Sequence, residues 1–503
     1  MAPDSIGEDR QSPALSSLDR YDLIFIALIA LAFVLRLYYF FLTKDQPLWW
    51  DEAEYMLKAK ALVFGTPATG WRATRPIFLP YLAAAFLKIG GGETTVRVLW
   101  IALSTIGIFF VSRIGALLFN RRVGLYAALL SSVFYIDLFY YTRLLVDASQ
   151  VFFILAAAFL LVRSLYGAGT KRGVRAIFPV LVLGTAMRFT AVLFFAVLGV
   201  FLLLIEGTTV WKKRDWRIAT AFGFLTSLPL MIYFWTEYGN PLYPFLHEGV
   251  LRDPSAAGTA AGGVFLEYAR YFPNYTSVSV TVVFIAGMFL AAGYVARRFS
   301  MLRADPGAQA YCLLLLWIVI PFIFFGFFVN HFEDRFLSMI FPAVFLLTGA
   351  ALDAAFDYIK RYSLTAAAVA VGGFLTYAAL SMAANSDAAI KDKLTSFAAI
   401  RDAGLWIKAR TRPGDVVVTS SVRQNTYYSE RASYAIPKKP EDFERLLAQR
   451  RPKFLVLSLW EQSPAWAYRW PEANAGKATL AAVFFFDEMR KAPAAAVYAF
   501  GGG

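Results

Sequence analysis

The chain is poor in the residues from which many small active sites are built. It has one cysteine, Cys312, and two histidines among 503 residues. A single cysteine excludes a disulfide within the chain and any cysteine-based metal site. Charged residues make up only 17% of the sequence, and the polar C-terminal part has no recognisable nucleophile, metal or glycine-rich nucleotide motif. Chemistry in this chain must therefore rest on a few carboxylates and arginines.

Hydrophobic residues, by contrast, make up 58% of the chain, and the mean hydropathy is +0.54. Soluble domains average about 45–50% apolar residues, so the composition predicts a polytopic membrane protein. The formal net charge is +14. In a membrane protein, Lys and Arg gather in cytoplasmic loops and hold the topology. We therefore do not expect nucleic acid as a partner.

The apolar runs predict the number of membrane crossings. A helix needs about 20 apolar residues to cross the hydrocarbon core. Candidate spans are 22–43, 94–119, 122–140, 147–165, 218–236, 277–296, 309–329, 336–357 and 364–384. The remaining block, 176–206, is too long for one ordinary span and short for two.

Charge decides how block 176–206 is folded. Basic clusters lie at Arg121–Arg122, Lys171–Arg175, Lys212–Arg214, Arg297–Arg303 and Lys360–Arg361. If all of them are cytoplasmic, the block must leave and re-enter on one side. It is then a hairpin of two short helices with Met187–Thr190 at its outer tip. This gives about 11 transmembrane segments, with the N-terminus inside and the C-terminus outside.

This topology divides the chain into three parts. Residues 1–21 form a cytoplasmic leader, and the first span reads as a retained signal anchor. Residues 22–384 form the transmembrane domain, with extracytoplasmic loops at 44–93 and 237–276. Residues 385–503 form an extracytoplasmic domain, in which a helix, strand, helix, strand pattern predicts a small α/β fold with a partly parallel sheet.

The first polar cluster follows directly on the first span. Asp51, Glu52 and Tyr55 stand among further aromatic residues beside hydrocarbon, where carboxylates are costly without partners. Neighbouring side chains on a helix point about 100° apart, so Asp51 and Glu52 are expected to differ in role. Asp51 and Tyr55 share one helical face. The start of an interfacial helix explains this stretch alone equally well.

Four further charged clusters fall on the same predicted side of the membrane. They are Arg72 with Arg75 before Pro76, Arg143 with Asp147 at helical spacing, Arg188 at the hairpin tip, and His331, Glu333, Asp334 and Arg335 before a later span. Each alone has a bland alternative, such as a snorkelling cation or a surface ion pair. Arg36, inside the first span, is expected to snorkel. Together, carboxylates for a general base and arginines for a phosphate are the parts needed for transfer from a phosphorylated donor.

Two other functions stay open on this pattern. A transporter or flippase for a lipid-linked sugar also explains the spans and the outer cations, but it predicts paired half-helices and ionisable residues near the midplane. A binding protein would use the C-terminal domain as its active part. Residues 251–263, small and flexible in composition, fit either a lid or a plain linker.

The clusters resemble the motifs of the GT-C superfamily of membrane glycosyltransferases. The nearest resemblance is to glycosyltransferase family 39, the protein O-mannosyltransferase and aminoarabinose-lipid A transferase group. Asp51–Glu52 with Tyr55 resembles the acidic signature of that group, Arg75–Pro76 its basic-Pro segment, and Arg143 to Asp147 its Arg-x-x-x-Asp. His331 to Phe336 resembles the His-x-x-x-Arg-Phe of related lipid-linked mannosyltransferases. The resemblance covers about residues 1–384, and a lysine is common where Arg75 and Arg188 stand.

The resemblance implies an inverting glycosyltransferase in the plasma membrane. It would move a hexose, mannose-like sugar or modified pentose from a polyprenyl-phosphate donor, such as a dolichyl phosphate, to a hydroxyl or phosphate. The acceptor would be a lipid, a glycan or a protein at the extracytoplasmic face. The implied catalytic residues are Asp51 as general base, Asp147 as second acid and Glu52 in support. The donor phosphate would be held by Arg75, Arg188 and Arg335, and substrate by Tyr55, Arg143 (paired with Asp147), His331, Glu333 and Asp334.

Cofactor use is not fixed by these motifs. Related enzymes differ in their metal requirement, so we assign no metal. Asp51, Glu52 and Asp147 would offer oxygen ligands if a divalent cation were needed. Membrane lipids are expected as partners, because the donor itself is a lipid.

Overall fold

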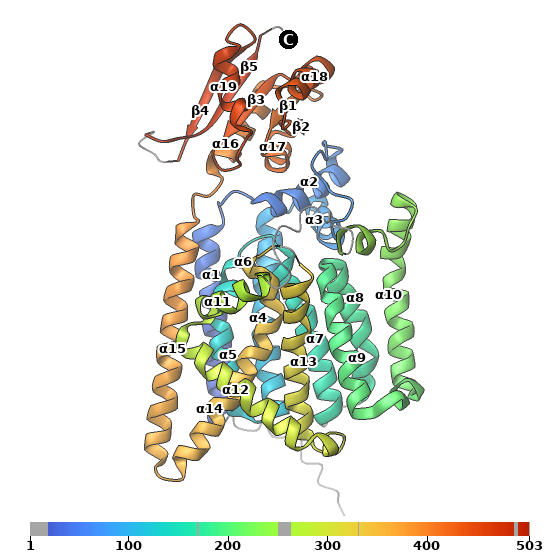
Figure 1. Cartoon of the computed structure of the whole chain (residues 1–503), viewed down its shortest axis with the longest axis vertical. Helices are drawn as coiled ribbons and strands as arrows, with labels where there is room; N and C mark the ends of the chain where they lie inside the picture. Colours follow the sequence, from blue (N-terminus) through green and yellow to red (C-terminus); the bar gives the residue numbers. More distant parts are fainter. Residues whose placement is uncertain (1–18, 168–170, 250–262, 330, 487–490, 502–503) are drawn as a thin grey trace, which may run out of the picture.

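A bundle of long apolar helices carries a small α/β domain at one end (Figure 1). The computed structural model describes residues 19–167, 171–249, 263–329, 331–486 and 491–501. Within these ranges, nine helices are long and apolar enough to cross a membrane, and α5 with α6, bent by 54°, makes a tenth span. The chain is a polytopic α-helical membrane protein. Most of the leader 1–21 and of segment 251–263 lies outside the described residues.

The helices of the bundle follow the predicted spans closely. They are α1 Arg20–Thr43, α4 Glu93–Leu118, α5 Arg121–Ser132, α6 Tyr135–Tyr141, α7 Val146–Tyr166, α8 Ile177–Met187, α9 Leu193–Glu206, α10 Arg214–Tyr238, α12 Val278–Arg297, α13 Pro306–Phe327, α14 Phe341–Lys360 and α15 Leu364–Asp392. The arms α8 and α9 form the predicted hairpin. Nine described helices, or ten with the bent pair α5–α6, are long and apolar enough to cross, and the predicted 11 segments are reached only when the 11-residue helix α8 is also counted as a crossing.

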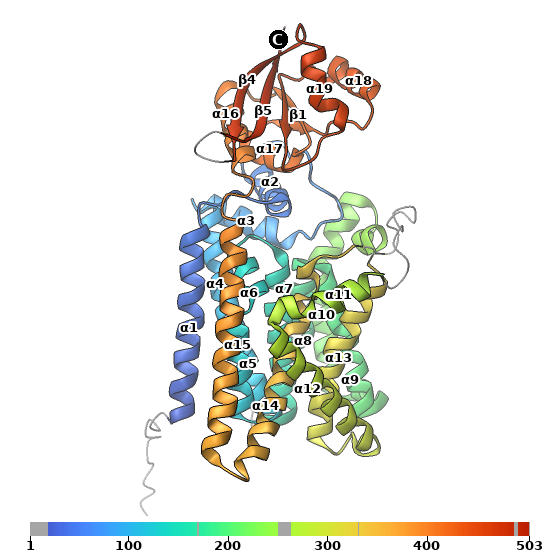
Figure 2. The same ribbon diagram turned by 60° about the vertical axis from the view of Figure 1, so that its left-hand side comes forward.

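The hairpin turns at Arg188, the only basic residue of block 176–206. Arg188 has an extended backbone (φ −151°, ψ 124°), which ends α8, and the short 3-10 helix η2, Phe189–Val192, leads into α9. The basic loops that join α4 to α5 and α14 to α15 lie at the opposite end of the bundle from the α/β domain (Figures 1 and 2). The arrangement of Lys and Arg used to predict the crossings therefore agrees with the fold.

Shorter helices cover the end of the bundle that faces the α/β domain. They are α2 Trp50–Phe64, α3 Phe78–Lys88, α11 Gly263–Thr276 and the 3-10 helix η7 Asp334–Ile340, which leads into α14. In both views α2 lies between the bundle and α17 of the α/β domain (Figures 1 and 2). The loops predicted on this side thus contain ordered elements that can place side chains precisely.

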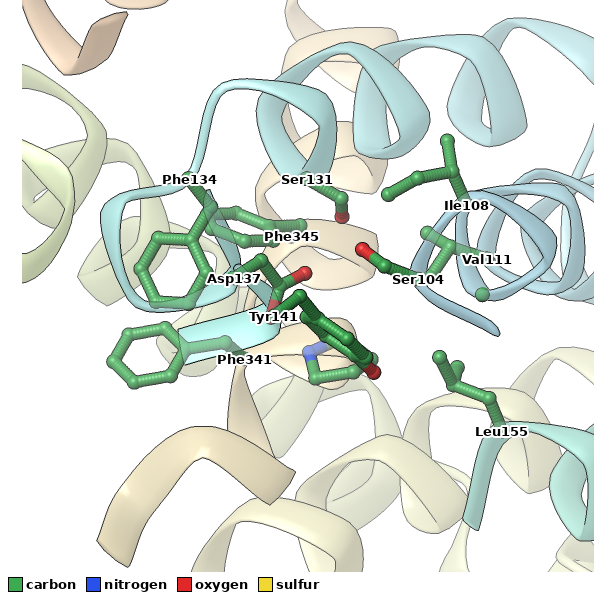
Figure 3. Close-up of a pocket in the computed structure, with 12 residues that line it drawn as sticks. Ser104, Ile108, Val111, Ser131, Phe134, Asp137, Tyr141, Leu155, Phe341 and Phe345 are labelled. Carbon is green, nitrogen blue, oxygen red and sulfur yellow. The ribbon is translucent and has the colours of Figure 1, made fainter. Parts of the chain in front are cut away.

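Arg36 does not snorkel, which corrects the expectation from the sequence. Its side chain is fully buried, and its guanidinium donates to Ser104 Oγ and to the carbonyl oxygens of Ala32 (3.1 Å) and Ser132 (3.3 Å). A cavity of about 10 Å³ lies beside Ser104. Figure 3 shows Asp137 pointing into the same space. This buried arginine is a packed polar element whose hydrogen bonds join α1 to α4 and α5, with the Asp137 carboxylate of α6 nearby.

The C-terminal domain is built on one mixed sheet. Its helices are α16 Ala398–Arg410, α17 Val422–Ser429, α18 Pro440–Arg450 and α19 Ala465–Ala473, and its strands are β1 Val416–Thr419, β2 Ala432–Tyr434, β3 Phe454–Ser458, β4 Ala478–Phe485 and β5 Pro493–Phe500. The strand order is β2-β1-β3-β5-β4. The first three strands are parallel, and β5 and β4 add antiparallel pairs. The partly parallel sheet is confirmed.

The α/β domain is tied to α2 by hydrogen bonds rather than tethered loosely. The Leu48 N–H donates to the Tyr428 hydroxyl over 2.7 Å, and the Ser433 N–H donates to Thr69 Oγ1 over 3.0 Å. Lys60 pairs with Glu430 at 3.0 Å. The helix α17 therefore sets one wall of the space above α2.

Candidate active site

Helix α2 presents acidic residues on two faces. It begins at Trp50, directly after the first span and a short turn, and ends where Gly65 adopts a left-handed conformation (φ 66°). Asp51, Glu52 and Glu54 lie in its first two turns, where the helix dipole favours negative charge. Because successive residues point about 100° apart, Glu52 points away from Asp51. Asp51 and Glu54, three residues apart, instead lie on one face and share Arg72 and Arg75.

Asp51 faces two arginines from distant parts of the chain. Arg75 pairs with its Oδ1, and the Arg335 guanidinium lies 2.8 Å from its Oδ2. Arg72 lies further off, at 3.7 Å. Burial acts to raise the pKa of Asp51, but the charges of Arg75 and Arg335 outweigh it and hold the pKa well below its usual range. The carboxylate is therefore ionised, and both oxygens are engaged.

Asp147 is the second carboxylate of the same cluster. It lies at the start of α7 and is fully buried. Arg188, at the turn of the hairpin, pairs with its Oδ1, and Arg335 lies 3.7 Å from its Oδ2. Arg188 is held by Thr190, whose hydroxyl accepts from Nε over 3.2 Å. The hairpin thus brings Arg188 to Asp147.

Arg335 bridges the two carboxylates. It contacts Asp51 and Asp147, and its Nε donates to Glu333 over 2.5 Å. Burial acts to raise the pKa of Glu333, but its bonds to His331 and Arg335 lower that pKa to about 2. The segment is fixed by Asp334, which accepts hydrogen bonds from the hydroxyls of two tyrosines on α6. The structure therefore brings Arg75, Arg188 and Arg335 together around Asp51 and Asp147.

Glu52 and Arg143 form a separate, buried pair. Glu52 accepts from the backbone N–H groups of Trp49 and Leu144, each over 2.7 Å, and lies 3.5 Å from Arg143. Arg143 also donates to Gln46 over 2.8 Å, and its guanidinium lies 3.7 Å from the Trp49 ring centroid. The expected pairing of Arg143 with Asp147 is wrong. Both side chains of this pair are used to hold α2 against the bundle, and the geometry sets them apart from the reacting groups.

We expect Glu52→Ala to destabilise the protein rather than to alter its chemistry. Removing one member of a buried ion pair leaves a charge without compensation, at a cost of about 3–5 kcal/mol. The thermal unfolding midpoint of the purified protein should fall strongly for Glu52→Ala and for Arg143→Ala. The double variant should be less destabilised than the sum of the two. Additive losses would show that the two side chains do not act as a pair.

Glu54 is a functional candidate that the sequence did not single out. Its carboxylate meets Arg72, Arg75 and Arg423 at 3.1, 3.2 and 3.0 Å. Arg423 comes from α17 of the C-terminal domain, so two domains share this carboxylate. Arg75 bridges Glu54 to Asp51. The sequence around Arg423 does not predict this role, because the contact between Arg423 and Glu54 depends on how the C-terminal domain docks on α2.

Tyr55 lies behind the cluster rather than in it. The ring is fully buried, its centroid lies 5.7 Å from the Arg75 guanidinium carbon, and burial raises the pKa of its hydroxyl. The shared face with Asp51 therefore places Tyr55 under Arg75. Its expected contact with substrate would be through that arginine.

The cluster as a whole carries one excess positive charge. The described arginines are Arg72, Arg75, Arg188, Arg335 and Arg423, and the carboxylates are Asp51, Glu54, Asp147 and Glu333. Among the described residues, no group of three or more acidic, histidine or cysteine side chains is placed to hold a metal ion. Each carboxylate is instead occupied by guanidinium groups. Such a site suits an anion, because arginine binds phosphate with two parallel hydrogen bonds.

Comparison with known structures identifies the architecture. ArnT from Cupriavidus metallidurans, solved bound to undecaprenyl phosphate, matches with a TM-score of 0.66 at 14% identity, over 94% of this chain and 97% of that chain. The oligosaccharyltransferase of Archaeoglobus fulgidus, tethered to an acceptor peptide, matches with a TM-score of 0.61 at 12% identity, over 86% and 69% of the two chains. The fold is that of the GT-C glycosyltransferases.

Other comparisons agree with the GT-C fold. The arabinofuranosyltransferase AftD from Mycobacteria matches with a TM-score of 0.56 at 14% identity, over 94% of this chain and 40% of that chain. The family model for dolichyl-phosphate-mannose-protein mannosyltransferase matches residues 74–234, a region that contains Arg75, Asp147 and Arg188. No protein of curated function matches the sequence. The GT-C resemblance drawn from the short motifs is thus confirmed at the level of fold.

Proposed function

We propose that the protein is an inverting glycosyltransferase that takes a sugar from a polyprenyl-phosphate donor and attaches it to an acceptor hydroxyl or phosphate. The observation that carries this proposal is the junction of Asp51, Asp147 and Arg335, with Arg75 and Arg188 on either side. A carboxylate for a general base and three arginines for a phosphate lie in one cluster at the end of a membrane bundle. The contact between Asp51 and Arg335 joins segments 284 residues apart.

In this proposal the donor phosphate competes with Asp51 for Arg75 and Arg335. When the phosphate takes these arginines, Asp51 loses its compensating charges and its basicity rises. Asp51 then accepts the proton of the acceptor hydroxyl, while that oxygen attacks the anomeric carbon from the face opposite the phosphate. The bond between the anomeric carbon and the phosphate oxygen breaks, and its electron pair stays on the phosphate. Arg75, Arg188 and Arg335 stabilise the charge that develops there.

The orientation that we propose for the site rests on the arrangement of basic residues. Helix α2, which carries Asp51, and the C-terminal domain lie at the end of the bundle away from the basic loops that join α4 to α5 and α14 to α15 (Figure 2). Basic loops face the cytoplasm, so we place the reaction at the extracytoplasmic face. Of the similar structures, that of ArnT is described as bound to undecaprenyl phosphate, which supports a polyprenyl phosphate as the lipid carrier.

A transfer assay tests the proposal. The purified protein, in lipid nanodiscs, is incubated with radiolabelled polyprenyl-phosphate mannose and polyprenyl-phosphate aminoarabinose, together with an extract of the cell envelope. Label should leave the donor lipid and appear in acceptor material, with release of polyprenyl phosphate. The variant Arg298→Ala, whose exposed ion pair with Asp305 lies far from the cluster, should behave as wild type. Movement of intact donor across a vesicle bilayer, without any product, would instead establish a flippase.

A further inference from the structure

A second cavity lies between α2 and the C-terminal domain. It has a volume of about 500 Å³, within the range of about 300–1,000 Å³ that is usual for ligand sites. One wall is formed by Trp50 and the loop 69–72, and the other by α17 and the end of β2. We call this cavity the interdomain cleft. The motifs read from the sequence do not account for it.

The lining of the interdomain cleft is aromatic and rich in hydrogen-bonding groups. Trp50, Trp71 and Tyr434 supply rings, and Ser420 and Thr69 supply hydroxyl groups. Trp50 is 44% exposed, so part of a large ring is open to a ligand. Arg72 and Arg423 are the charged lining residues, and among the described residues no carboxylate lines the cleft. Flat apolar faces beside fixed donors and hydroxyls suit a sugar ring, which has an apolar face and a rim of hydroxyl groups.

The walls of the cleft are held in place by the same residues that reach the charge cluster. Arg423 lies 4.4 Å from the Trp50 ring centroid and 3.0 Å from Glu54, and its Nε donates to the Gly70 carbonyl over 3.2 Å. Gly70 has a positive φ of 95°, and a Cβ there would lie 3.0 Å from the Arg423 side chain. Loop 69–72 can therefore approach α17 this closely because residue 70 is glycine.

Two residues that line the cleft connect it to Asp51. Trp50 precedes Asp51 in α2, and Arg72, which lines the cleft, lies 3.7 Å from the Asp51 carboxylate. A ligand in the cleft would thus hold a hydroxyl near the residue to which we assign the proton transfer. The donor phosphate would bind Arg75, Arg188 and Arg335, none of which lines the cleft. The two substrates would therefore approach Asp51 from different sides.

We propose, on the basis of the function proposed above, that the interdomain cleft binds a sugar unit of the acceptor, so that the acceptor is a glycan or the carbohydrate part of a glycolipid. Trp50 is the stacking surface, and Arg423, Arg72 and the cleft hydroxyls bind the ring hydroxyl groups. Arg423 is a positioning residue contributed by the C-terminal domain. That domain thus takes part in recognising the acceptor.

A glycan-binding experiment tests this inference without using the donor. Fluorescently labelled full-length protein, in nanodiscs free of sugar detergents, is applied to a printed array of defined soluble glycans. We expect wild type to bind at least one class of glycan, Trp50→Ala to weaken that binding about tenfold, and Trp50→Phe to restore most of it. The variant Ala435→Trp, which fills the cleft from an exposed lining residue, should abolish it.

The control variant is Ala448→Trp, which adds the same ring at an exposed position of α18 away from the cleft. It should bind glycan as wild type does. Both tryptophan variants should bind labelled polyprenyl phosphate normally, because the arginines of the charge cluster are untouched. The inference is overturned if no glycan binds, or if Ala435→Trp binds as well as Ala448→Trp. Glycan binding in this experiment together with no consumption of donor in the transfer assay described above would overturn the proposed function instead.

Discussion

Asp51→Asn is expected to lower kcat for sugar transfer by about 10²–10⁴-fold, the usual contribution of a positioned general base. The same change should tighten the binding of polyprenyl phosphate. Asparagine keeps the shape of the side chain but removes the charge that engages Arg75 and Arg335, so both arginines become more available to the phosphate. Steady-state kinetics give kcat, and equilibrium binding of labelled polyprenyl phosphate gives Kd. If kcat and the Kd for polyprenyl phosphate both fall, the variant has lost the general base but has kept the phosphate-binding site.

The matched control for this prediction is Glu333→Gln. Glu333 also pairs with Arg335, over 2.5 Å, but we assign it no proton transfer. Glu333→Gln should keep kcat within about tenfold of wild type, because it removes the partly exposed ion pair between Glu333 and Arg335 and leaves the general base in place. The base assignment fails if Asp51→Asn transfers sugar at the wild-type rate, or if Glu333→Gln loses as much activity.

The transmembrane bundle could be predicted from the sequence because each span is determined by its own apolar run and its direction by the charges that flank it. An apolar run long enough to span the membrane fixes each helix within the run itself, and the basic loops fix the parity of the crossings. Block 176–206 shows how far this reaches. Length alone left it undecided, and the positions of the flanking charges resolved it into α8 and α9 with Arg188 between them. No long-range contact had to be known.

The pairing of Arg143 failed because it relied on a helix that is not there. The spacing of Arg143 and Asp147 places two side chains on one face only if the segment between them is helical. Leu145 has an extended backbone (φ −101°, ψ 141°), and α7 begins at Val146. Arg143 therefore points back to Glu52, and Asp147 points into the cluster. The charges were identified correctly, but their partners depended on backbone angles that the sequence does not display.

Two features of the C-terminal domain could not be predicted from the sequence, for different reasons. The strands β4 and β5 are rich in alanine, which by intrinsic preference favours helix, and their pairing with β3 overrides that preference. Arg423 reaches Glu54 only because α17 docks on α2. A contact of this kind depends on the packing of two domains, so it becomes visible only in three dimensions.

Arg335→Ala should be the most damaging change among the arginines, because Arg335 is the residue that joins Asp51 to Asp147. Without it, the donor phosphate loses a cation and the two acids lose their shared partner. We expect kcat/KM for the donor to fall by about 10²–10³-fold, as when one group stabilising a developing negative charge is removed.

Arg335→Lys should recover only part of this loss, because a lysine ammonium is a point charge that cannot present a planar fork to several oxygens. Kinetics with labelled donor, at matched amounts of folded protein, measure both effects. Combining Arg335→Ala with Asp51→Asn should cost more than the two losses multiplied together, because either single variant already removes the ion pair that the donor phosphate must break. Wild-type kcat/KM in Arg335→Lys, or independent losses in the double variant, would show that Arg335 acts as a diffuse charge rather than as the bridge between the base and the phosphate.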